Sequence, residues 1–178
     1  MVLCHPPEIS VTPLEDVLLR MKAMGIIHVD TFPFPTSPPP ASITAAIQLL
    51  RNLGAINISD DRLTSLGEQI ARYPIGPRYA KMIVMAANTS DEKLLAHTLT
   101  LVASLSERSP FNDGNDRRGA FRHVDGDAMA RLKAIGAFLF NCRPRKGKGS
   151  SDIQLRRESF CGEHGLNLGV VDKCLLLR

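Results

Sequence analysis

The sequence predicts a mainly α-helical protein, and three observations carry that prediction. Aromatic residues make up only 5% of the 178 residues and Trp is absent, so the core must be aliphatic and rich in alanine. Apolar residues recur in several series at the three- and four-residue spacing of a helix. Only residues 55–64 have the short extended runs and acidic turn that are typical of a β-hairpin.

Two helices are expected near the start of the chain, each with its own start and stop signals. The first runs over Leu14–Met24, has two carboxylates in its first turn, and is followed by Gly25 as a C-terminal cap. The second is expected to begin with Ser42 as its N-cap and to end at Gly54 after an apolar stripe. Both patterns indicate short amphipathic helices that bury one face.

A proline-rich segment, FPFPTSPPP at 32–40, separates these two helices. Proline removes a backbone donor and fixes φ, so this segment cannot be a helix or a central strand. We expect an extended loop whose Phe32 and Phe34 pack onto the core. A ligand for an SH3-type domain is the functional alternative.

A hairpin and a third helix complete the first half. Ala55–Ile58 and Arg62–Thr64 flank the acidic turn Ser59–Asp61, and a helix is expected over Ser65–Arg72. Helix, helix, hairpin, helix is the order of a winged-helix variant with a short β-hairpin. The second helix carries a single cation, Arg51, which argues against reading of duplex bases by that helix.

The second half predicts a helical bundle. Its helices are expected at 78–87, 91–105, 128–140 and 169–177. The helix at 91–105 should be capped by Ser90 and should be central, because it is apolar on most sides, and His97 on it is interpreted as a core or boundary histidine. Residues 106–124 are interpreted as a linker or mobile loop, and 141–151 as an exposed basic loop. The buried stripe expected on the helix at 128–140 is Met129, Leu132, Ile135 and Leu139.

Positive charge is concentrated in the second half of the chain. Residues 1–105 contain 8 Lys and Arg against 9 Asp and Glu, whereas residues 106–178 contain 14 against 9. The total charge is +4. A basic half fits a partner that carries phosphates, and it equally fits a solvated surface, so charge alone does not decide between them.

No catalytic constellation is present in the sequence. The phosphate-binding patterns GxxxxGK[ST] and GxGxxG are absent, as are HExxH and GxSxG. The acidic pairs Asp60–Asp61 and Asp125–Asp127 fall where a turn or a helix cap explains them. By its own residues this chain is therefore not predicted to be an enzyme.

Cysteine usage favours reduced, structural thiols. The four cysteines form no CxxC pair. Cys161 and His164 have a CxxH spacing that could begin a zinc site, but a buried cysteine is the favoured interpretation, so no metal is expected. No apolar run approaches the roughly 20 residues of a membrane span, and no membrane partner is expected.

Several of these segments, in this order, resemble the C-terminal module of DEAH-box RNA helicases. The most specific is LTSLGEQIARYPIGPRYAKM at Leu63–Met82. The other similar segments are Pro7–Ile9, Leu14–Ile27, Phe34–Pro35, Ala46–Ile56, Gly126–Phe138 and Phe160–Asn167. The resemblance implies a winged helix over 1–76 and a helical-bundle "ratchet" domain over 77–178 that ends before an OB-fold. FPFPTSPPP and YPIGPRYAKM are most similar to the nucleolar subgroup that acts in assembly of the small ribosomal subunit.

The resemblance implies a supporting part in RNA unwinding. In the family, ATP and Mg bind two RecA-like domains that are absent from this chain, so no cofactor is expected here. The chain would brace that motor and line the channel for single-stranded RNA. The implied partners are single-stranded or structured RNA such as an rRNA precursor, the RecA lobes, the OB-fold and an activator protein. The implied location is the nucleus or nucleolus, with the cytoplasm as the alternative.

Six cations of the basic half are the candidates for RNA contact, since flexible Arg and Lys side chains reach phosphates without reading sequence. They are Arg117, Arg118, Arg143, Arg145, Lys146 and Lys148, with Arg131 and Lys133 as weaker candidates. Each also has a plainer interpretation as a solvated surface charge. Two other functions stay open, a free-standing protein-interaction module and a winged-helix regulator that binds duplex DNA.

Overall fold

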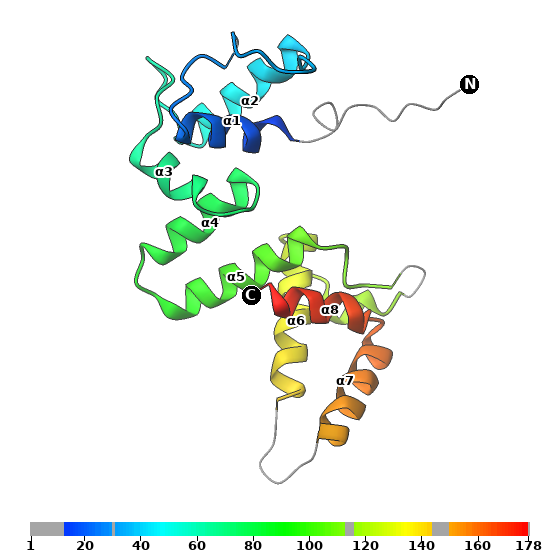
Figure 1. Cartoon of the computed structure of the whole chain (residues 1–178). Coiled ribbons are helices and arrows are strands. Elements are labelled where there is room, and N and C mark those ends of the chain that lie inside the picture. Colours follow the sequence, from blue (N-terminus) through cyan, green and yellow to red (C-terminus); the bar gives the residue numbers. More distant parts are fainter. Residues whose placement is uncertain (1–12, 30, 113–115, 144–149, 178) are drawn as a thin grey trace, which may run out of the picture. The chain divides into compact units, whose positions relative to one another are not determined.

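The computed structural model describes residues 13–29, 31–112, 116–143 and 150–177, without the side chains of 116–118 and 150. The chain divides into two compact units, residues 1–88 and residues 89–178, and each is treated by itself (Figure 1). The described residues form eight α-helices and one short 3-10 helix, with almost no strand. The predicted mainly α-helical class is confirmed.

Unit 1 is built from four short helices. They are α1 (Leu14–Ala23), α2 (Pro40–Asn52), α3 (Ser65–Ala71) and α4 (Pro77–Ala87). Helix α1 packs against the other three, and α3 packs against α4. Gly25 and Gly54 follow α1 and α2 with φ of +89° and +71°, the left-handed conformation that glycine adopts without a steric cost.

Two sequence expectations for α2 and the segment before it need correction. Helix α2 begins at Pro40, not at Ser42, and the Ser42 amide donates to the carbonyl of Pro39 (2.9 Å). Proline is pre-organised for the first helical position, so the proline run starts the helix. Of the two phenylalanines, Phe34 packs against the core, but Phe32 stays 37% exposed and meets Phe34 edge to face.

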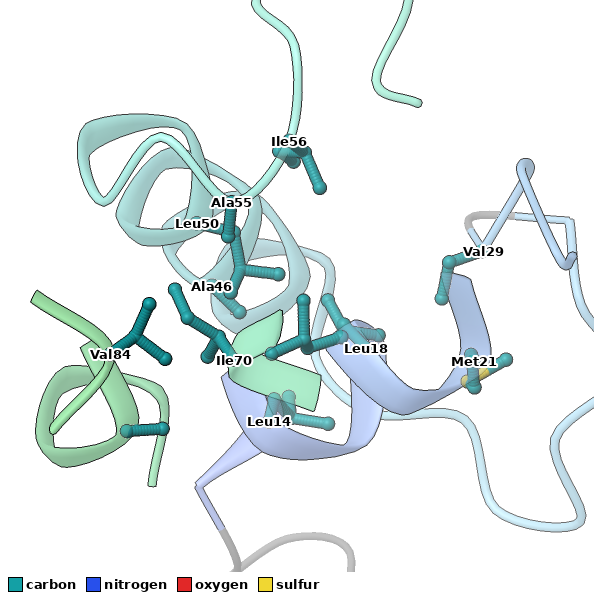
Figure 2. Close-up of a cluster of buried hydrophobic side chains, with 12 residues drawn as sticks. Leu14, Leu18, Met21, Val29, Ala46, Leu50, Ala55, Ile56, Ile70 and Val84 are labelled. Atoms are coloured by element: carbon teal, nitrogen blue, oxygen red, sulfur yellow. The ribbon is translucent and has the colours of Figure 1, made fainter. Parts of the chain in front are cut away.

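The core of unit 1 is aliphatic. Figure 2 shows Leu14 and Leu18 of α1 and Ile70 of α3 gathered beside Leu50 of α2, with Val84 of α4 at the margin. Leu18 and Leu50 have no exposed surface. Burying each such side chain contributes about 1.5–3 kcal/mol.

The predicted hairpin is reduced to a single antiparallel bridge between Ile56 and Leu63. The amide of Asn57 donates to the carbonyl of Arg62 (2.8 Å), and the amide of Asp61 donates back to Asn57 (3.1 Å). Asp61 has a positive φ of 55°, which Asp tolerates better than most residues. The wing of this winged helix is therefore a tight turn.

The described part of unit 2 consists of α5 (Glu92–Ser106), η2 (Asp116–Phe121), α6 (Asp127–Asn141), α7 (Ser150–His164) and α8 (Leu168–Leu176). Helices α5, α6 and α7 have 15 residues each and are longer than any helix described in unit 1. Helix α5 packs on α6 and α8, while α7 packs on α6, η2 and α8. Ile135 of α6, Ala103 of α5 and Cys174 of α8 meet in one buried cluster.

Helix α7 was not predicted, because its inner face is not conspicuously apolar. Its partly or fully buried residues are Asp152, Ile153, Arg156, Arg157, Phe160, Cys161 and His164, at helical spacing. Arginine packs its aliphatic stem and leaves its charged end in water, so two arginines replace the leucines that would have indicated a buried face.

The segment 106–124 is attached to the bundle where it is described, which corrects its interpretation as a linker or mobile loop. Phe111 forms an antiparallel bridge with Leu166, and the Asn112 amide donates to the Gly165 carbonyl (2.9 Å). Phe121 of η2 is buried beside the ring of His164. Two aromatic side chains, Phe111 and Phe121, therefore attach this polar segment to the bundle. The Gly and Asp content of the segment gave no indication of this attachment.

Candidate functional site

The LTSLG part of the sequence signature forms a packed junction in unit 1. Thr64 is the N-cap of α3, because its hydroxyl accepts from the Gly67 amide (3.0 Å). The same hydroxyl donates to the carbonyl of Gly54 (2.7 Å), at the end of α2. A Cβ on Gly67 would lie 2.0 Å from the Ala55 carbonyl oxygen, so only glycine allows α3 to approach this closely.

Three cations of unit 1 bind groups of their own fold. Lys22 is only 7% exposed, and its ammonium donates to the carbonyls of Ile27 (3.0 Å) and Asp61 (2.9 Å). Arg51 forms a two-point ion pair with the Asp61 carboxylate (2.8 and 3.0 Å), which raises the pKa of the Arg51 guanidinium. Lys81 donates to the Leu53 carbonyl at the end of α2 (2.9 Å). The single cation of α2 is therefore engaged in the fold.

Unit 2 has a groove of about 1240 Å³ that is lined largely by α5 and α6. Its apolar lining includes Leu94 and Leu101 from α5 and Met129, Leu132 and Leu139 from α6. Its basic lining consists of Lys93, His97, His123, Lys133, Arg143 and Arg157. No Asp or Glu occurs among the lining residues that the structure describes.

The sequence predicts that the bulky apolar residues of α6 face the core. In the structure most of them face outwards instead, and they form one side of the groove. Of the predicted stripe, only Ile135 is fully buried, while Met129, Leu132 and Leu139 are half-buried and line the groove. Ala130, Ala134 and Phe138 form the inner face instead. Small side chains let neighbouring helices approach closely, so alanines make the contact and the larger residues turn outwards.

Helix α5 is also less central than predicted. Its buried residues lie in its second half, whereas Leu94 is 44% exposed and His97 is exposed on the groove. The helix is capped by Asp91, whose carboxylate accepts from the amides of Lys93 (2.9 Å) and Leu94 (3.1 Å). Ser90, the predicted cap, has a positive φ of 58° and belongs to the preceding turn.

The six predicted RNA-contact residues are only partly within the described structure. Arg145, Lys146 and Lys148 lie outside it, and Arg117 and Arg118 have a described backbone in η2 without described side chains. Arg143 is exposed, lines the groove, and places its guanidinium 5.0 Å from the ring centre of Phe140. No grouping of the six is therefore seen, and their role stays a prediction.

The two weaker candidates differ sharply from each other. Arg131 donates to the carbonyls of Ser104 (2.7 Å) and Glu107 (3.3 Å), and so satisfies the end of α5. Lys133 is exposed on the groove. Lys93 and His97 were missed as groove residues, although their four-residue spacing indicates that they share one face of a helix.

Unit 2 holds three buried thiols. Burial raises the pKa of Cys161 to about 11 and raises the pKa of Cys142 and Cys174 as well. The ring of His164 stacks on Phe160 and lies beside Phe121. Among the residues with a described position, no three His, Cys, Asp or Glu side chains converge in a way that could hold a metal ion. None of the described helices combines the length and the apolar character that crossing a membrane requires.

Comparison with known families gives two adjoining matches. Residues 46–75 match the winged-helix part of the helicase associated domain (HA2), and residues 76–154 match its ratchet-like part. That division precedes α4, whereas the compact units of the structure divide after Asn88. The predicted boundary between 76 and 77 stays a prediction.

Similar proteins carry the names of RNA helicases. The probable ATP-dependent RNA helicase DHX37 of Homo sapiens is 37% identical over 161 residues, which cover 82% of this chain and 13% of that protein. The probable ATP-dependent RNA helicase kurz of Drosophila melanogaster is 31% identical over 199 residues, covering 97% and 16%. The probable ATP-dependent RNA helicase DHR1 of Saccharomyces cerevisiae is 39% identical over 106 residues, covering 59% and 8%. The chain thus spans a small part of the length of these relatives.

Proposed function

The chain belongs to the C-terminal helicase-associated region of the DEAH-box ATP-dependent RNA helicases, and we propose that it serves there as a non-catalytic module that braces the motor and lines the path of single-stranded RNA. One feature supports a bracing role, namely that unit 1 uses Lys22, Arg51 and Lys81 to join its own elements. The non-catalytic part of the proposal is supported by the sequence, in which the phosphate-binding pattern does not occur. ATP and Mg would then bind elsewhere in a complete helicase.

One observation supports RNA contact most directly, the Phe140–Arg143 pair at the end of α6. Phe140 is 66% exposed, and the Arg143 guanidinium lies over its ring at 5.0 Å. An exposed ring can stack on a base and the adjacent guanidinium can contact phosphate, which together bind single strands without sequence preference. The pair directly precedes the basic residues Arg145, Lys146 and Lys148.

Binding of a fluorescein-labelled oligouridylate of about 12 nucleotides to the full chain tests this proposal. Anisotropy is measured across KCl from about 50 to about 200 mM for the unchanged chain and for charge reversal at Arg143, Arg145, Lys146 and Lys148. Each phosphate contact that is lost should lower the salt slope of log K by about 0.7. Phe140→Ala should weaken binding and leave that slope unchanged, because a ring carries no charge.

Lys173→Glu is the control, since Lys173 is exposed on α8 and does not line the groove. Unchanged affinity and an unchanged salt slope in the four-residue reversal would remove this loop from the RNA path. A fall in affinity in Lys173→Glu as large as in the single reversal Arg143→Glu would show that only net charge matters.

We further propose that the RNA is a precursor of ribosomal RNA and that the complete protein acts in the nucleolus, with the cytoplasm as the alternative location. The likeness of FPFPTSPPP and YPIGPRYAKM to the nucleolar subgroup supports this. Ultraviolet crosslinking in cells that express the tagged complete protein, followed by sequencing of the bound RNA, tests it. Enrichment of pre-rRNA over messenger RNA is expected, and equal recovery of all RNA classes would contradict the proposal.

A further inference from the structure

The groove between α5 and α6 has chemistry that single-stranded RNA does not require. Its central lining is aliphatic, with Leu94 and Leu101 on one helix and Met129 and Leu132 on the other. Sequence-tolerant RNA binding depends on aromatic rings for base stacking. The exposed phenyl ring on this groove, Phe140, belongs to the last turn of α6. The middle of the groove thus offers mainly aliphatic anchoring positions, and the exposed ring among them is the imidazole of His97.

The ionisable side chains that line the groove are basic, apart from the Cys142 thiol, among the residues that the structure describes. Lys93 on α5 and Lys133 on α6 are exposed, and no acidic partner is seen for either ammonium among the described residues. Two other basic residues of the lining are already paired, His123 with Asp125 (3.2 Å) and Arg157 with Asp172. The two lysines, one from each helix, therefore leave positive charge beside an apolar lining that contains no described carboxylate.

We propose that this groove docks an amphipathic helix of a partner protein that carries Asp or Glu beside an apolar stripe. A helix presents apolar side chains at positions i, i+3, i+4 and i+7, and these would occupy the lining between Leu94, Leu101 and Leu132. Its flanking carboxylates would pair with Lys93 and Lys133. Met129 adapts its shape more readily than a branched residue, which suits a surface that receives a separate chain.

Two helical peptides of about 15 residues are the probes, and they share one leucine stripe but differ in their flanking residues, Glu in the first and Lys in the second. Fluorescence anisotropy gives the affinity of each peptide for the full chain. The Glu peptide should bind about three- to tenfold more tightly, and the double variant Lys93→Glu, Lys133→Glu should reverse that preference. A scrambled Glu peptide without a stripe should bind more weakly than the ordered one.

Matched controls separate docking from net charge and from RNA binding. The double variant Arg122→Glu, Lys173→Glu makes the same change in net charge at exposed sites of unit 2 outside the groove lining, and it should retain the preference for the Glu peptide. Charge reversal at Arg145, Lys146 and Lys148, which are not among the described lining residues, should weaken oligouridylate binding and leave the preference in place. Circular dichroism of each variant confirms that the helices are retained.

Three outcomes would overturn the proposal. The first is equal affinity for the Glu and Lys peptides. The second is a preference that the groove and control double variants change equally. The third is competitive displacement of the Glu peptide by oligouridylate, with loss of both ligands in Lys93→Glu, Lys133→Glu, which would make the groove an RNA site.

Discussion

The two units use their lysines in opposite ways. In unit 1, Lys22 and Lys81 donate to backbone carbonyls of other elements. In unit 2, Lys93 and Lys133 border a groove, and no partner is seen for their ammonium groups within the described structure. Arginines do not show this contrast, because Arg131, Arg156 and Arg157 of unit 2 all bind groups of their own fold. Lysine side chains therefore help to hold unit 1 together, and in unit 2 they leave exposed positive charge.

Helix length accounts for part of this difference. Helix α3 has 7 residues and α1 has 10, too short to be stable without tertiary contacts, whereas α5, α6 and α7 have 15 residues each. Polar side chains that donate hydrogen bonds to the carbonyls of another element add contacts that a small aliphatic core does not provide. Helix α6 of unit 2 packs through Ala130 and Ala134, so more of its surface is free to carry charge.

Gly67→Ala is the strongest test that unit 1 depends on tight internal fit. The new Cβ would lie 2.0 Å from the Ala55 carbonyl oxygen, a backbone atom that cannot rotate away. We expect a loss of about 3 kcal/mol or more in the free energy of unfolding of unit 1. Tyrosine emission in a urea titration reports this transition, because the chain has two tyrosines, Tyr73 and Tyr79, and no Trp.

The matched control is Gly162→Ala on α7, where a Cβ would have nothing within 4 Å. It should stabilise unit 2 by roughly 0.5 to 1 kcal/mol through helix propensity. In a Cys4→Ser background, the rate of labelling at the three buried thiols reports opening of unit 2. The labelling rate gives a free energy of opening for unit 2. If Gly67→Ala lowered this free energy by as much as it lowered the free energy of unfolding of unit 1, the two units would not be energetically separate.

A lysine-to-methionine substitution in each unit compares the two uses of lysine directly. Lys22→Met leaves the carbonyls of Ile27 and Asp61 without their ammonium donor, at a cost of about 2 kcal/mol in the unfolding of unit 1. Lys133→Met removes an exposed charge and should change the unfolding of unit 2 by less than about 0.5 kcal/mol. Equal effects in parallel urea titrations would show that the contrast between the units is not energetic.

Local signals in the sequence were sufficient to predict most helices. They did not predict which side chains from different elements contact one another. Gly25 and Gly54 marked helix ends correctly because a left-handed residue after a helix is a local requirement. By contrast, Lys22 and Asp61 are 39 positions apart, and no local pattern joins them.

The candidate site was harder to predict than the fold. Periodicity shows that α6 has an apolar face, but Ala130 and Ala134 pack inwards while Met129 and Leu132 line the groove. Which of two apolar faces is buried depends on how closely the neighbouring helix approaches, and single-sequence spacing does not contain that distance. Three of the six predicted RNA contacts also lie outside the described residues.

The last prediction uses the buried thiols, which sharpen the comparison because the described cysteines are all in unit 2. Burial raises the pKa of Cys161 to about 11 from an ordinary value of 9.0, so the folded state favours the neutral thiol. The unfolded chain therefore loses its proton first as pH rises. The stabilising contribution is complete below about pH 9 and is lost as pH rises towards 11.

Cys161→Ala removes this contribution and leaves the other titrating groups in place. Between those two pH values, the free energy of unfolding of unit 2 should fall more steeply in the unchanged chain than in Cys161→Ala, as followed by circular dichroism in urea. The unfolding of unit 1 should show the same pH slope in both proteins, because Cys161 belongs to the other compact unit. A slope in unit 2 that did not depend on Cys161 would mean that its thiol ionises as readily in the folded as in the unfolded state, which burial should prevent.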